Sequence, residues 1–307
     1  MVRQSDERIQ SATDHFFTQP LMSPGDNLRL IRQKTEARLR EIVRRTRGAL
    51  GLMVLDLTSD EQFAFNEHCV FPQASAIKIP ILMEVYKQAG EGRLKLTDSH
   101  RIEKHDKTPG SGVLCELGDG TVQMNLHDLC VLMIVLSENT ATNMLIDLVG
   151  METVNQTLQS LGFKQTRLQR RMMDLAAAAC GKENLSTPFE AARIMETLHR
   201  GEFISRVVCD DILAILKRPK PGAISSALPE GISIAFKPGA IGGVTTEWAI
   251  VLVKDRPYVV AVMENYGLDQ EASGAIKEIS KTLFDYFQRL SHSTPHGVFL
   301  PRTHPSV

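Results

Sequence analysis

A serine and a lysine three positions apart, Ser75 and Lys78, have the types and spacing that covalent catalysis requires. They belong to the segment Phe71–Lys78, where a serine at the start of a helix meets the positive end of the helix dipole. A lysine three residues later projects from the same face, and its amine accepts the hydroxyl proton only when it is neutral. Burial and neighbouring positive charge lower a lysine pKa and so supply that neutral form. The pair predicts a serine nucleophile and its base, although Ser-x-x-Lys alone often occurs by chance.

A second polar cluster, Ser137-Glu138-Asn139, follows the apolar run Leu132–Leu136 and precedes an expected helix. On such a short connection the alternate residues Ser137 and Asn139 can point into one cavity. A hydroxyl suits proton relay to a leaving group, and an amide suits docking of a substrate amide. Serine and asparagine also favour helix N-caps, so a purely structural role is the alternative.

A third cluster, Lys237-Pro238-Gly239-Ala240, is expected at the end of a strand. A fixed ammonium group there would polarise the site, and Gly239 would let a substrate approach the backbone. The Ala240 N–H could join the N–H of Ser75 as an oxyanion hole. The alternative is an ordinary strand end that leads into a turn.

The elements that would position these motifs follow from the spacing of apolar residues. A helix capped by Asp26 and ending near Gly48 is predicted first. Two strands then cover Ala49–Leu57 and Gln62–Asn66, joined by a Thr-Ser-Asp turn. The N-terminal part of the chain therefore predicts an amphipathic helix followed by a hairpin.

The pattern from Ala74 to about Lys217 is helical, interrupted by a Gly- and Pro-rich loop over Lys104–Gly120. Strands return near the end of the chain, and Trp248 on one of them is expected in the core. The predicted helices cover Leu126–Leu136, Ala141–Leu148, Met151–Leu161, Pro188–His199 and Gln270–Leu290, and the predicted strands cover Ile232–Lys237, Glu247–Lys254 and Tyr258–Asn265.

This order predicts an α+β fold in which both ends of the chain contribute to one antiparallel sheet flanked by helices. The middle of the chain would form an inserted all-α lobe, and the cleft between lobes would hold the site. We expect a flexible leader over residues 1–25, an α/β lobe over 26–70 plus 218–290, an all-helical lobe over 71–217, and a flexible tail over 291–307.

Composition narrows the classes of partner and location. The 307 residues carry a net charge of −1, which favours neither nucleic acid nor an anionic membrane surface. No apolar stretch approaches the ~18 residues that span a bilayer, and the first 25 residues contain no run resembling a signal-peptide core. We therefore expect a cytoplasmic protein, a monomer or weak oligomer, with a periplasmic location open if translation starts elsewhere.

The five cysteines are scattered and form no CxxC pair, so the sequence suggests neither a zinc site nor a disulfide framework. We expect them to be reduced and mostly buried, as in the cytoplasm. The histidines lack metal-ligand spacing, and neither a metal nor a cofactor is expected.

The three clusters together resemble the S-x-x-K, S-D-N and K-T-G motifs of β-lactamases and penicillin-binding proteins. Over about residues 26–290 the chain resembles the class A β-lactamase superfamily. Pro109–Leu114 and Leu168–Asp174 look like segments of a D,D-peptidase-like branch of related serine hydrolases. The resemblance implies a β-lactamase/transpeptidase-like fold and an acyl-enzyme mechanism. It assigns Ser75, Lys78, Ser137 and Lys237 to catalysis, and it assigns Asn139, Glu138, Gly239, Ala240, Thr245 and Thr246 to substrate binding.

One departure from this family concerns the release of the acyl group. Class A β-lactamases place a glutamate on the loop after the helical block, and it activates the deacylating water. That position falls at Met172, whose thioether cannot act as a base. Asp174 and Glu183 are the nearby carboxylates that could substitute.

The other departures concern the substrate carboxylate. Pro238 replaces the hydroxyl residue of the third motif, and Val244–Glu247 contains no cation where the family has an arginine. Losing two charge-assisted contacts, at ~1.5–3 kcal/mol each, weakens binding of a carboxylate substrate by several tenfold steps. Lys237 with Thr245 or Thr246 would still hold a carboxylate loosely. Glu138 in place of aspartate is a milder change.

The sequence therefore predicts a serine hydrolase that acylates Ser75 with a small amide or ester and deacylates penicillins poorly. The substrate would be a D-Ala-type peptide, a β-lactam or a neutral ester. Two alternatives remain: a true β-lactamase that uses Asp174 or Glu183 as its base, and a catalytically idle ligand-binding relative.

Overall fold

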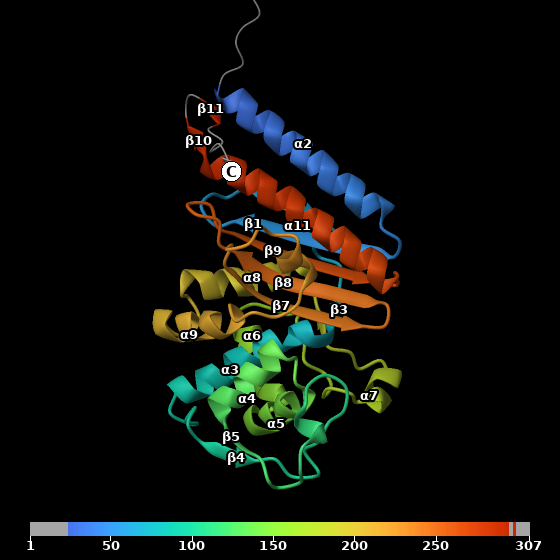
Figure 1. Ribbon diagram of the computed structural model, residues 1–307, viewed down its shortest axis with the longest axis vertical. Helices are drawn as coiled ribbons and strands as arrows, with labels where there is room; N and C mark the ends of the chain where they lie inside the picture. The colour runs from blue at the N-terminus through green and yellow to red at the C-terminus, as the bar shows by residue number, and fades with distance from the viewer. Residues whose placement is uncertain (1–23, 295–296, 299–307) are drawn as a thin grey trace, which may run out of the picture.

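The computed structural model, which describes residues 24–294 and 297–298, has one five-stranded antiparallel sheet at its centre (Figure 1). The strand order is β2-β1-β9-β8-β7, so the first and last strands of this sheet in chain order, β1 and β9, pair in its interior. The register of β1 against β9 runs from Ala49 opposite Asn265 to Asp56 opposite Tyr258. The strands are β1 (Ala49–Asp56), β2 (Gln62–Phe65), β7 (Ile234–Ile241), β8 (Val244–Val251) and β9 (Tyr258–Asn265). The predicted α+β fold is confirmed.

One face of this sheet is covered by the two long terminal helices, α2 (Pro24–Arg45) and α11 (Asp269–Ser291) (Figure 1). Their apolar stripes pack with the sheet into one buried cluster, which includes Leu39 of α2 and Leu283 of α11. At the solvent side, Glu278 of α11 forms ion pairs with two arginines of α2. Sequence periodicity predicted both helices, but α2 begins two residues before Asp26, the residue expected as its cap.

The opposite face carries α8 (Pro188–Arg200) and α9 (Arg206–Leu216), and most of the other helices are stacked beyond them (Figure 1). A second buried cluster runs without interruption from the sheet residues Trp248 and Met263 into these helices. The further helices are α3 (Lys78–Gly90), α4 (Leu126–Val135), α5 (Asn139–Val149) and α6 (Met151–Ser160). One core joins the sheet to the helical block, so no gap in the packing of the described residues marks a boundary between two lobes. The predicted lobe boundaries stay a prediction.

Short elements that the sequence pattern did not reveal connect these layers. The strand pairs are β3 (Phe71–Pro72) with β6 (Leu185–Ser186), β4 (Ser99–Arg101) with β5 (Gln123–Asn125), and β10 (Ser293–Thr294) with β11 (Gly297–Val298). The short helices are η1 (Ala74–Ile77), η2 (Leu114–Glu116), α7 (Leu175–Ala179) and α10 (Ala223–Ser226). Within the described residues, no helix has both the length and the apolar character needed to cross a membrane. The expected leader, apart from its last residues, and most of the expected tail lie outside the described residues.

Two expectations were wrong. The strand of the third motif does not end near Lys237 but continues to Ile241, and the turn falls at Gly242-Gly243. Proline is tolerated at position 238 because β7 is an edge strand, in which alternate N–H groups make no ladder bond. The cysteines are all unpaired, but only Cys130 and Cys209 are buried.

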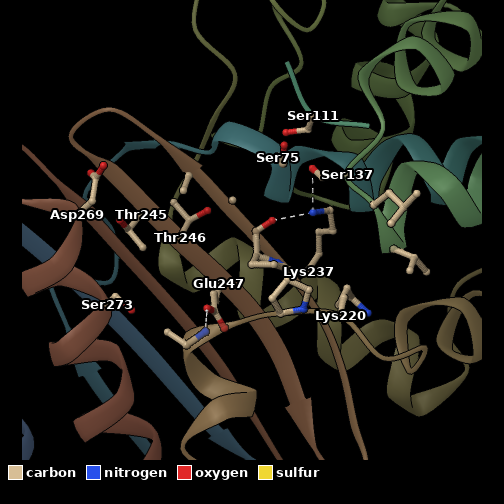
Figure 2. Close-up of a pocket in the computed structure, with 17 residues that line it drawn as sticks. Ser75, Ser111, Ser137, Lys220, Lys237, Thr245, Thr246, Glu247, Asp269 and Ser273 are labelled. Atoms are coloured by element: carbon tan, nitrogen blue, oxygen red, sulfur yellow. Dashed lines mark hydrogen bonds between the residues drawn. The ribbon is translucent and has the colours of Figure 1, made fainter. Parts of the chain in front are cut away.

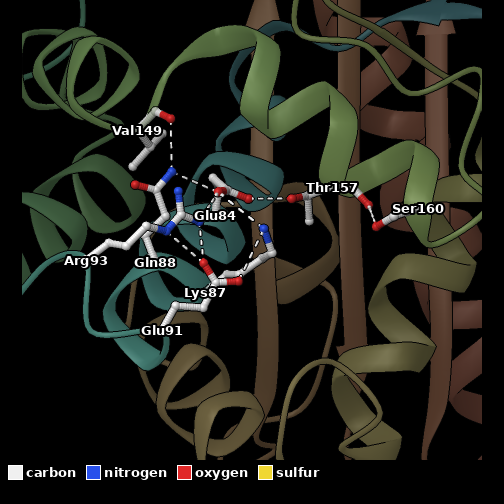
Figure 3. Close-up of polar contacts among 8 residues, drawn as sticks. All are labelled: Glu84, Lys87, Gln88, Glu91, Arg93, Val149, Thr157 and Ser160. Atoms are coloured by element: carbon white, nitrogen blue, oxygen red, sulfur yellow. Dashed lines mark hydrogen bonds and ion pairs between the residues drawn. The ribbon is translucent and has the colours of Figure 1, made fainter.

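A buried carboxylate fixes α3, the helix that begins at the predicted base (Figure 3). Glu84 is fully buried, and its carboxylate accepts hydrogen bonds from Thr157 Oγ1 of α6 at 2.6 Å and from Gln88 Nε2 at 2.8 Å. Lys87 and Arg93 supply positive charge at 3.7 and 3.8 Å. A buried charge that is paired and hydrogen-bonded in this way holds α3 against α6.

Candidate active site

Ser75 lies in the single 3₁₀ turn η1, and α3 begins at Lys78. Residues at i and i+3 of a 3₁₀ turn eclipse one another, so Ser75 and Lys78 share one face. Gln73 holds this turn: its carbonyl oxygen accepts the Ala76 N–H at 2.9 Å and the Thr246 hydroxyl at 3.1 Å. The Thr246 hydroxyl, predicted to contact substrate, therefore fastens the nucleophile turn to β8.

The side chain of Gln73 is fixed in the same way. Trp248 donates its indole N–H to Gln73 Oε1 at 2.9 Å, and both side chains are fully buried. This confirms Trp248 as a core residue. Gln73 was missed by sequence reasoning, because a single glutamine before a serine gives no signal until its burial is known.

Strand β7 passes directly against the Ser75 turn at Gly239. A Cβ at Gly239 would lie 2.7 Å from Ser75 N, Ala76 N and Gln73 O, which are all backbone atoms. Glycine is therefore required by this close approach.

The direction of the Pro238 carbonyl shows which residues of β7 point their N–H groups away from β8. Its carbonyl oxygen accepts a hydrogen bond from Lys237 Nζ at 2.7 Å and so does not face β8. Residues two apart on an antiparallel strand point their N–H groups to the same side. The Ala240 N–H accordingly faces the free edge of the sheet, and Ala240 lines both cavities that contain Ser75.

Lys78 is completely buried and its ammonium group is surrounded by oxygen atoms. Nζ donates to the Ser137 carbonyl at 2.7 Å, the Ser137 hydroxyl at 3.1 Å and Asn139 Oδ1 at 3.0 Å. Ser137 presents two of these oxygens from a left-handed backbone (φ 53°), a strained conformation of the kind that clusters at functional sites. Burial lowers the Lys78 pKa to about 7, and the negative charge of Glu138 partly opposes this shift.

Lys237 is the second buried amine of the site (Figure 2). Its Nζ lies 3.2 Å from the Ser137 hydroxyl, so this hydroxyl bridges Lys237 and Lys78. Burial is the main reason that the Lys237 pKa falls well below its ordinary value, and the positive charges of Lys78 and Lys220 add to it. Lys78, Ser137 and Lys237 are therefore joined by hydrogen bonds into one chain of polar groups.

Glu138 does not face the substrate region, contrary to expectation. Its carboxylate caps α5 by accepting the Ala141 N–H at 2.6 Å, and it also accepts the Leu114 N–H at 3.2 Å. The side chain is fully buried against Gly112. Burial raises its pKa, although these backbone hydrogen bonds oppose the shift. Its role is structural, whereas Asn139 turns toward Lys78.

Two cavities meet at Ser75. The first, of about 370 Å³, has more charged side chains in its walls, and Figure 2 shows it between the sheet edge and Ser137. Its walls include Ser111, Ser137, Lys220, Lys237, Pro238, Gly239, Ala240, Thr245, Thr246 and Glu247. The second, of about 220 Å³, contains Ala74, Gly110, Ser111, Asn139, Arg170, Met172, Met173, Leu175, Asn184, Ala240 and Ile241 in its walls.

The first cavity contains a cation that sequence reasoning missed. Lys220 lies in the segment between the second and third motifs and belongs to neither, and its Nζ donates to the carbonyls of Leu216 at 2.7 Å and Arg218 at 2.8 Å. It also lies over the Phe236 ring, 4.3 Å from the centroid. Burial lowers the Lys220 pKa to about 8.

Glu247 occupies the sheet position beside Pro238. Its carboxylate accepts the N–H groups of Ala223 and Ile224, which anchors α10 to β8. Burial raises the Glu247 pKa to about 7, although these hydrogen bonds and Lys237 oppose the shift. The Thr245 hydroxyl on the same strand is buried at the cavity wall and has no hydrogen-bond partner within the described residues.

The carboxylates considered as deacylation bases are both engaged elsewhere. Asp174 caps α7 by accepting the Ala177 N–H at 2.9 Å, and Glu183 pairs with Arg170 at 2.7 Å. Neither belongs to the walls of the two cavities, whereas Met172 lines the second one. Among the described residues, no three His, Cys, Asp or Glu side chains converge to hold a metal ion.

Comparison with known proteins places this geometry in context. The model of the beta-lactamase enzyme family matches residues 34–287. The chain is similar to beta-lactamase CARB-3 of Pseudomonas aeruginosa, with 26% identity over 83% of this chain and 91% of that protein.

Two solved structures are similar in fold. A beta-lactamase from Sphaerobacter thermophilus shares 32% identity with a TM-score of 0.75, over 82% of this chain and 96% of the other. PBP-A shares 28% identity with a TM-score of 0.77, over 83% of this chain and 96% of the other.

Proposed function

From its membership of the beta-lactamase enzyme family we propose that this chain forms a long-lived acyl-enzyme at Ser75. The chain is a serine hydrolase of the penicillin-recognising superfamily. The substrate is a small ester or amide. The observation that carries the proposal is the pair of buried amines, Lys78 and Lys237, which share the Ser137 hydroxyl. The cavity wall near Ser75 has the thioether of Met172 at the position where a carboxylate was expected.

In the acylation step, neutral Lys78 takes the proton of the Ser75 hydroxyl while Oγ attacks the substrate carbonyl carbon. The N–H groups of Ser75 and Ala240 stabilise the negative oxygen that forms. The proton then passes from Lys78 through Ser137, supported by Lys237, to the leaving group as its bond to the acyl carbon breaks. Asn139 orients the substrate amide. Each of these groups has an assigned task, which disfavours the idle ligand-binding alternative.

Release of the acyl group needs a base that activates water, and this is the weak step. Met172 cannot accept a proton, and Asp174 and Glu183 are held by a helix N-terminus and by Arg170. A variant of PBP-A has been solved as an acyl-enzyme complex with penicillin G, and comparable trapping is expected here. A true β-lactamase with a non-standard base is the second candidate. It predicts steady turnover of nitrocefin that Asp174→Asn or Glu183→Gln abolishes.

The first cavity would hold the leaving group. Lys237, Lys220 and the unpartnered Thr245 hydroxyl offer positive charge and one hydrogen-bonding group there. This restores in part the carboxylate binding that Pro238 removes, so a D-Ala-type peptide, a β-lactam and a neutral ester all stay candidate substrates. The cytoplasmic location and the monomer or weak-oligomer state also stay predictions.

The test is intact-mass measurement after incubation with penicillin. We expect one acyl adduct per chain that persists for many minutes, is lost in Ser75→Ala, and is retained in Ser233→Ala, a control at an exposed serine outside both cavities. Absence of an adduct with penicillins, esters and fluorophosphonates would contradict the proposed function. Rapid nitrocefin turnover would refute only the slow release of the acyl group.

A further inference from the structure

A hollow away from Ser75 collects three cations that the acylation chemistry does not use. It has a volume of about 930 Å³ and lies between α6 and the loop that follows this helix, whose two legs are residues 164–169 and 182–185. Among the described residues, it shares no wall residue with either cavity at Ser75. We propose that the hollow binds a small multivalent anion, such as a diphosphate or triphosphate group, which restrains the loop. Such binding does not require the acyl-enzyme.

The three cations come from both legs of the loop. Lys164 and Arg167 lie on the first leg, and Lys182 lies on the second. All three residues are exposed, and none forms an ion pair with another residue that the structure describes. Glu152 of α6 is the only acidic residue in the described part of the walls. Positive charge therefore exceeds negative charge in the hollow.

The carboxylates nearest along the loop and on α5 are already paired with other cations. Arg170 is paired with Glu183 at 2.7 Å, and Arg171 is paired with Asp147 at 2.9 Å. The cations of the hollow are thus left to repel one another across the two legs of the loop. Like charges that are held together raise the free energy of the protein, and a bound anion of opposite charge lowers it again.

The backbone that carries these cations is fixed on both sides of the hollow. Arg167 exchanges backbone hydrogen bonds with Leu185 of the second leg, at 2.8 and 2.9 Å. Asn155 of α6 exchanges two hydrogen bonds with the backbone of Leu168, both at 2.8 Å. An anion would therefore meet cations whose backbone needs no rearrangement, which lowers the entropic cost of binding.

The free donors of Arg167 suit a phosphate group. Its Nε donates to the Lys164 carbonyl at 3.1 Å, whereas its two Nη groups make no hydrogen bond to a described residue. A guanidinium group binds two phosphate oxygens with its planar fork, and a lysine adds a point charge. A multivalent anion can contact Arg167 and Lys182 together, which chloride cannot. The volume lies within the range of roughly 300–1,000 Å³ that is usual for small-molecule sites.

An anion that contacts both legs would restrain the part of the loop between them. This part carries Met172 and Met173 to the wall of the second cavity. We therefore expect slower amide hydrogen exchange over residues 170–181 when the anion is bound. The hollow would in this way connect the concentration of a charged metabolite to the mobility of a wall of the active site.

The experiment is isothermal titration calorimetry of the full chain with sodium triphosphate at constant ionic strength. We expect one site per chain. Arg167→Gln and Lys182→Gln should each weaken binding by about threefold, and the double variant by about tenfold, because each change removes one exposed charged contact. Two lysine controls should bind as the native chain does: Lys281→Gln at an exposed position of α11, and Lys220→Gln in the first cavity.

A second variant tests the repulsion without any ligand. Lys182→Glu places a carboxylate beside the two unpaired cations of the first leg, so it should raise the thermal midpoint at low salt and abolish triphosphate binding. Lys281→Glu is the matched control and should change neither. A Lys182→Glu chain that still binds triphosphate as the native chain does would contradict the proposed site.

The remaining outcomes are equally decisive. No heat of binding, or equal binding by the native chain and the double variant, would overturn the proposal. Binding that Lys220→Gln abolishes and the double variant keeps would place the anion in the first cavity and would also overturn it. Binding without slower exchange over residues 170–181 would overturn the restraint of the loop. None of these results depends on acylation of Ser75, which the intact-mass measurement tests separately.

Discussion

At the scale of single residues, the site depends on a lysine placed where water cannot reach it. Lys78 has no exposed surface, and its pKa is lowered to about 7 by burial. The three oxygens around Nζ stabilise the ammonium form but do not outweigh the loss of hydration. Lys78 is therefore poised between acid and base at neutral pH, as a residue that first takes and then returns a proton must be.

The pH dependence of acylation follows from this pKa. Because only neutral Lys78 accepts the Ser75 proton, the acylation rate constant should rise about tenfold per pH unit below an apparent pKa of about 7 and level off above it. Stopped-flow acylation between pH 5 and 9 measures the profile, with Lys277→Ala as a surface-lysine control. A flat profile would exclude Lys78 as the base, and Lys78→Arg should abolish acylation at every pH.

Glu247 provides a second, thermodynamic pH effect. Its pKa is raised to about 7 in the folded protein from an ordinary value of 4.5, so the folded state holds the proton more tightly than the unfolded state. The resulting stabilisation is complete below about pH 4.5 and is lost as pH rises through about 7. Glu247→Gln should therefore gain stability relative to the native chain, by up to ~3 kcal/mol, between pH 4.5 and 8. Urea unfolding at several pH values measures this, with Glu230→Gln as the control at an exposed glutamate.

At the scale of elements, the position of Ser75 depends on the contact between strand β7 and the turn η1. Gln73 ties the Ser75 turn to β8 through Thr246 and Trp248, and β7 approaches it at Gly239. The turn therefore rests on the sheet, although Lys78 and Ser137 belong to the helices. Small shifts of β7 against this turn would displace Ser75 from both the Ala240 N–H and its base.

Gly239→Ala tests that contact. The new Cβ would lie 2.7 Å from three backbone atoms that cannot rotate away, so the turn or the strand must move. We expect a loss of about 1–3 kcal/mol in stability and at least a hundredfold fall in Ser75 acylation. Thermal unfolding and intact-mass kinetics measure the two effects. Gly242→Ala, where an added Cβ meets nothing within 4 Å, should change neither, and equal behaviour of the two variants would contradict the predicted strain.

At the scale of the whole molecule, the sheet separates two buried hydrophobic clusters, one on each of its faces. The cluster with α2 and α11 stabilises the terminal helices, and the other joins the sheet to the helical block and encloses the site. Because Ser75 and Lys237 lie where the sheet edge meets these helices, the site exists only when both parts are folded together.

Cooperative unfolding is the expected consequence of the shared core. Trp248 is the only tryptophan of the chain and is fully buried in the cluster that spans the sheet and the helices. Its fluorescence reports on the sheet, whereas circular dichroism at 222 nm reports mainly on the helices. The two urea transitions should coincide. Separate midpoints would instead support two lobes that unfold independently, as the predicted boundaries at residues 70 and 217 allow.

The three motifs, the two halves of the sheet and the main helices could all be predicted from sequence, because each rests on local spacing. Residues three apart share a helix face, and apolar runs bounded by Gly and Pro form strands, whatever else the chain does. The same reasoning missed η1, α7 and the paired short strands, because elements of two to five residues carry too few side chains to show a period.

The chemistry around the nucleophile was decided by tertiary structure. Lys220 places a cation in the first cavity, whereas the strand after the third motif has none. Glu138 caps helix α5 and does not point into the cavity. The partners of Asp174 and Glu183, the two carboxylates considered as bases, became known only from the structure. Residue types and spacing thus predicted a base for Ser75 at Lys78, three positions away. Only the tertiary structure determined which distant charged side chains face Ser75 and which are paired elsewhere. The reason is that the protonation state and burial of a side chain depend on neighbours that the linear order of the chain does not specify.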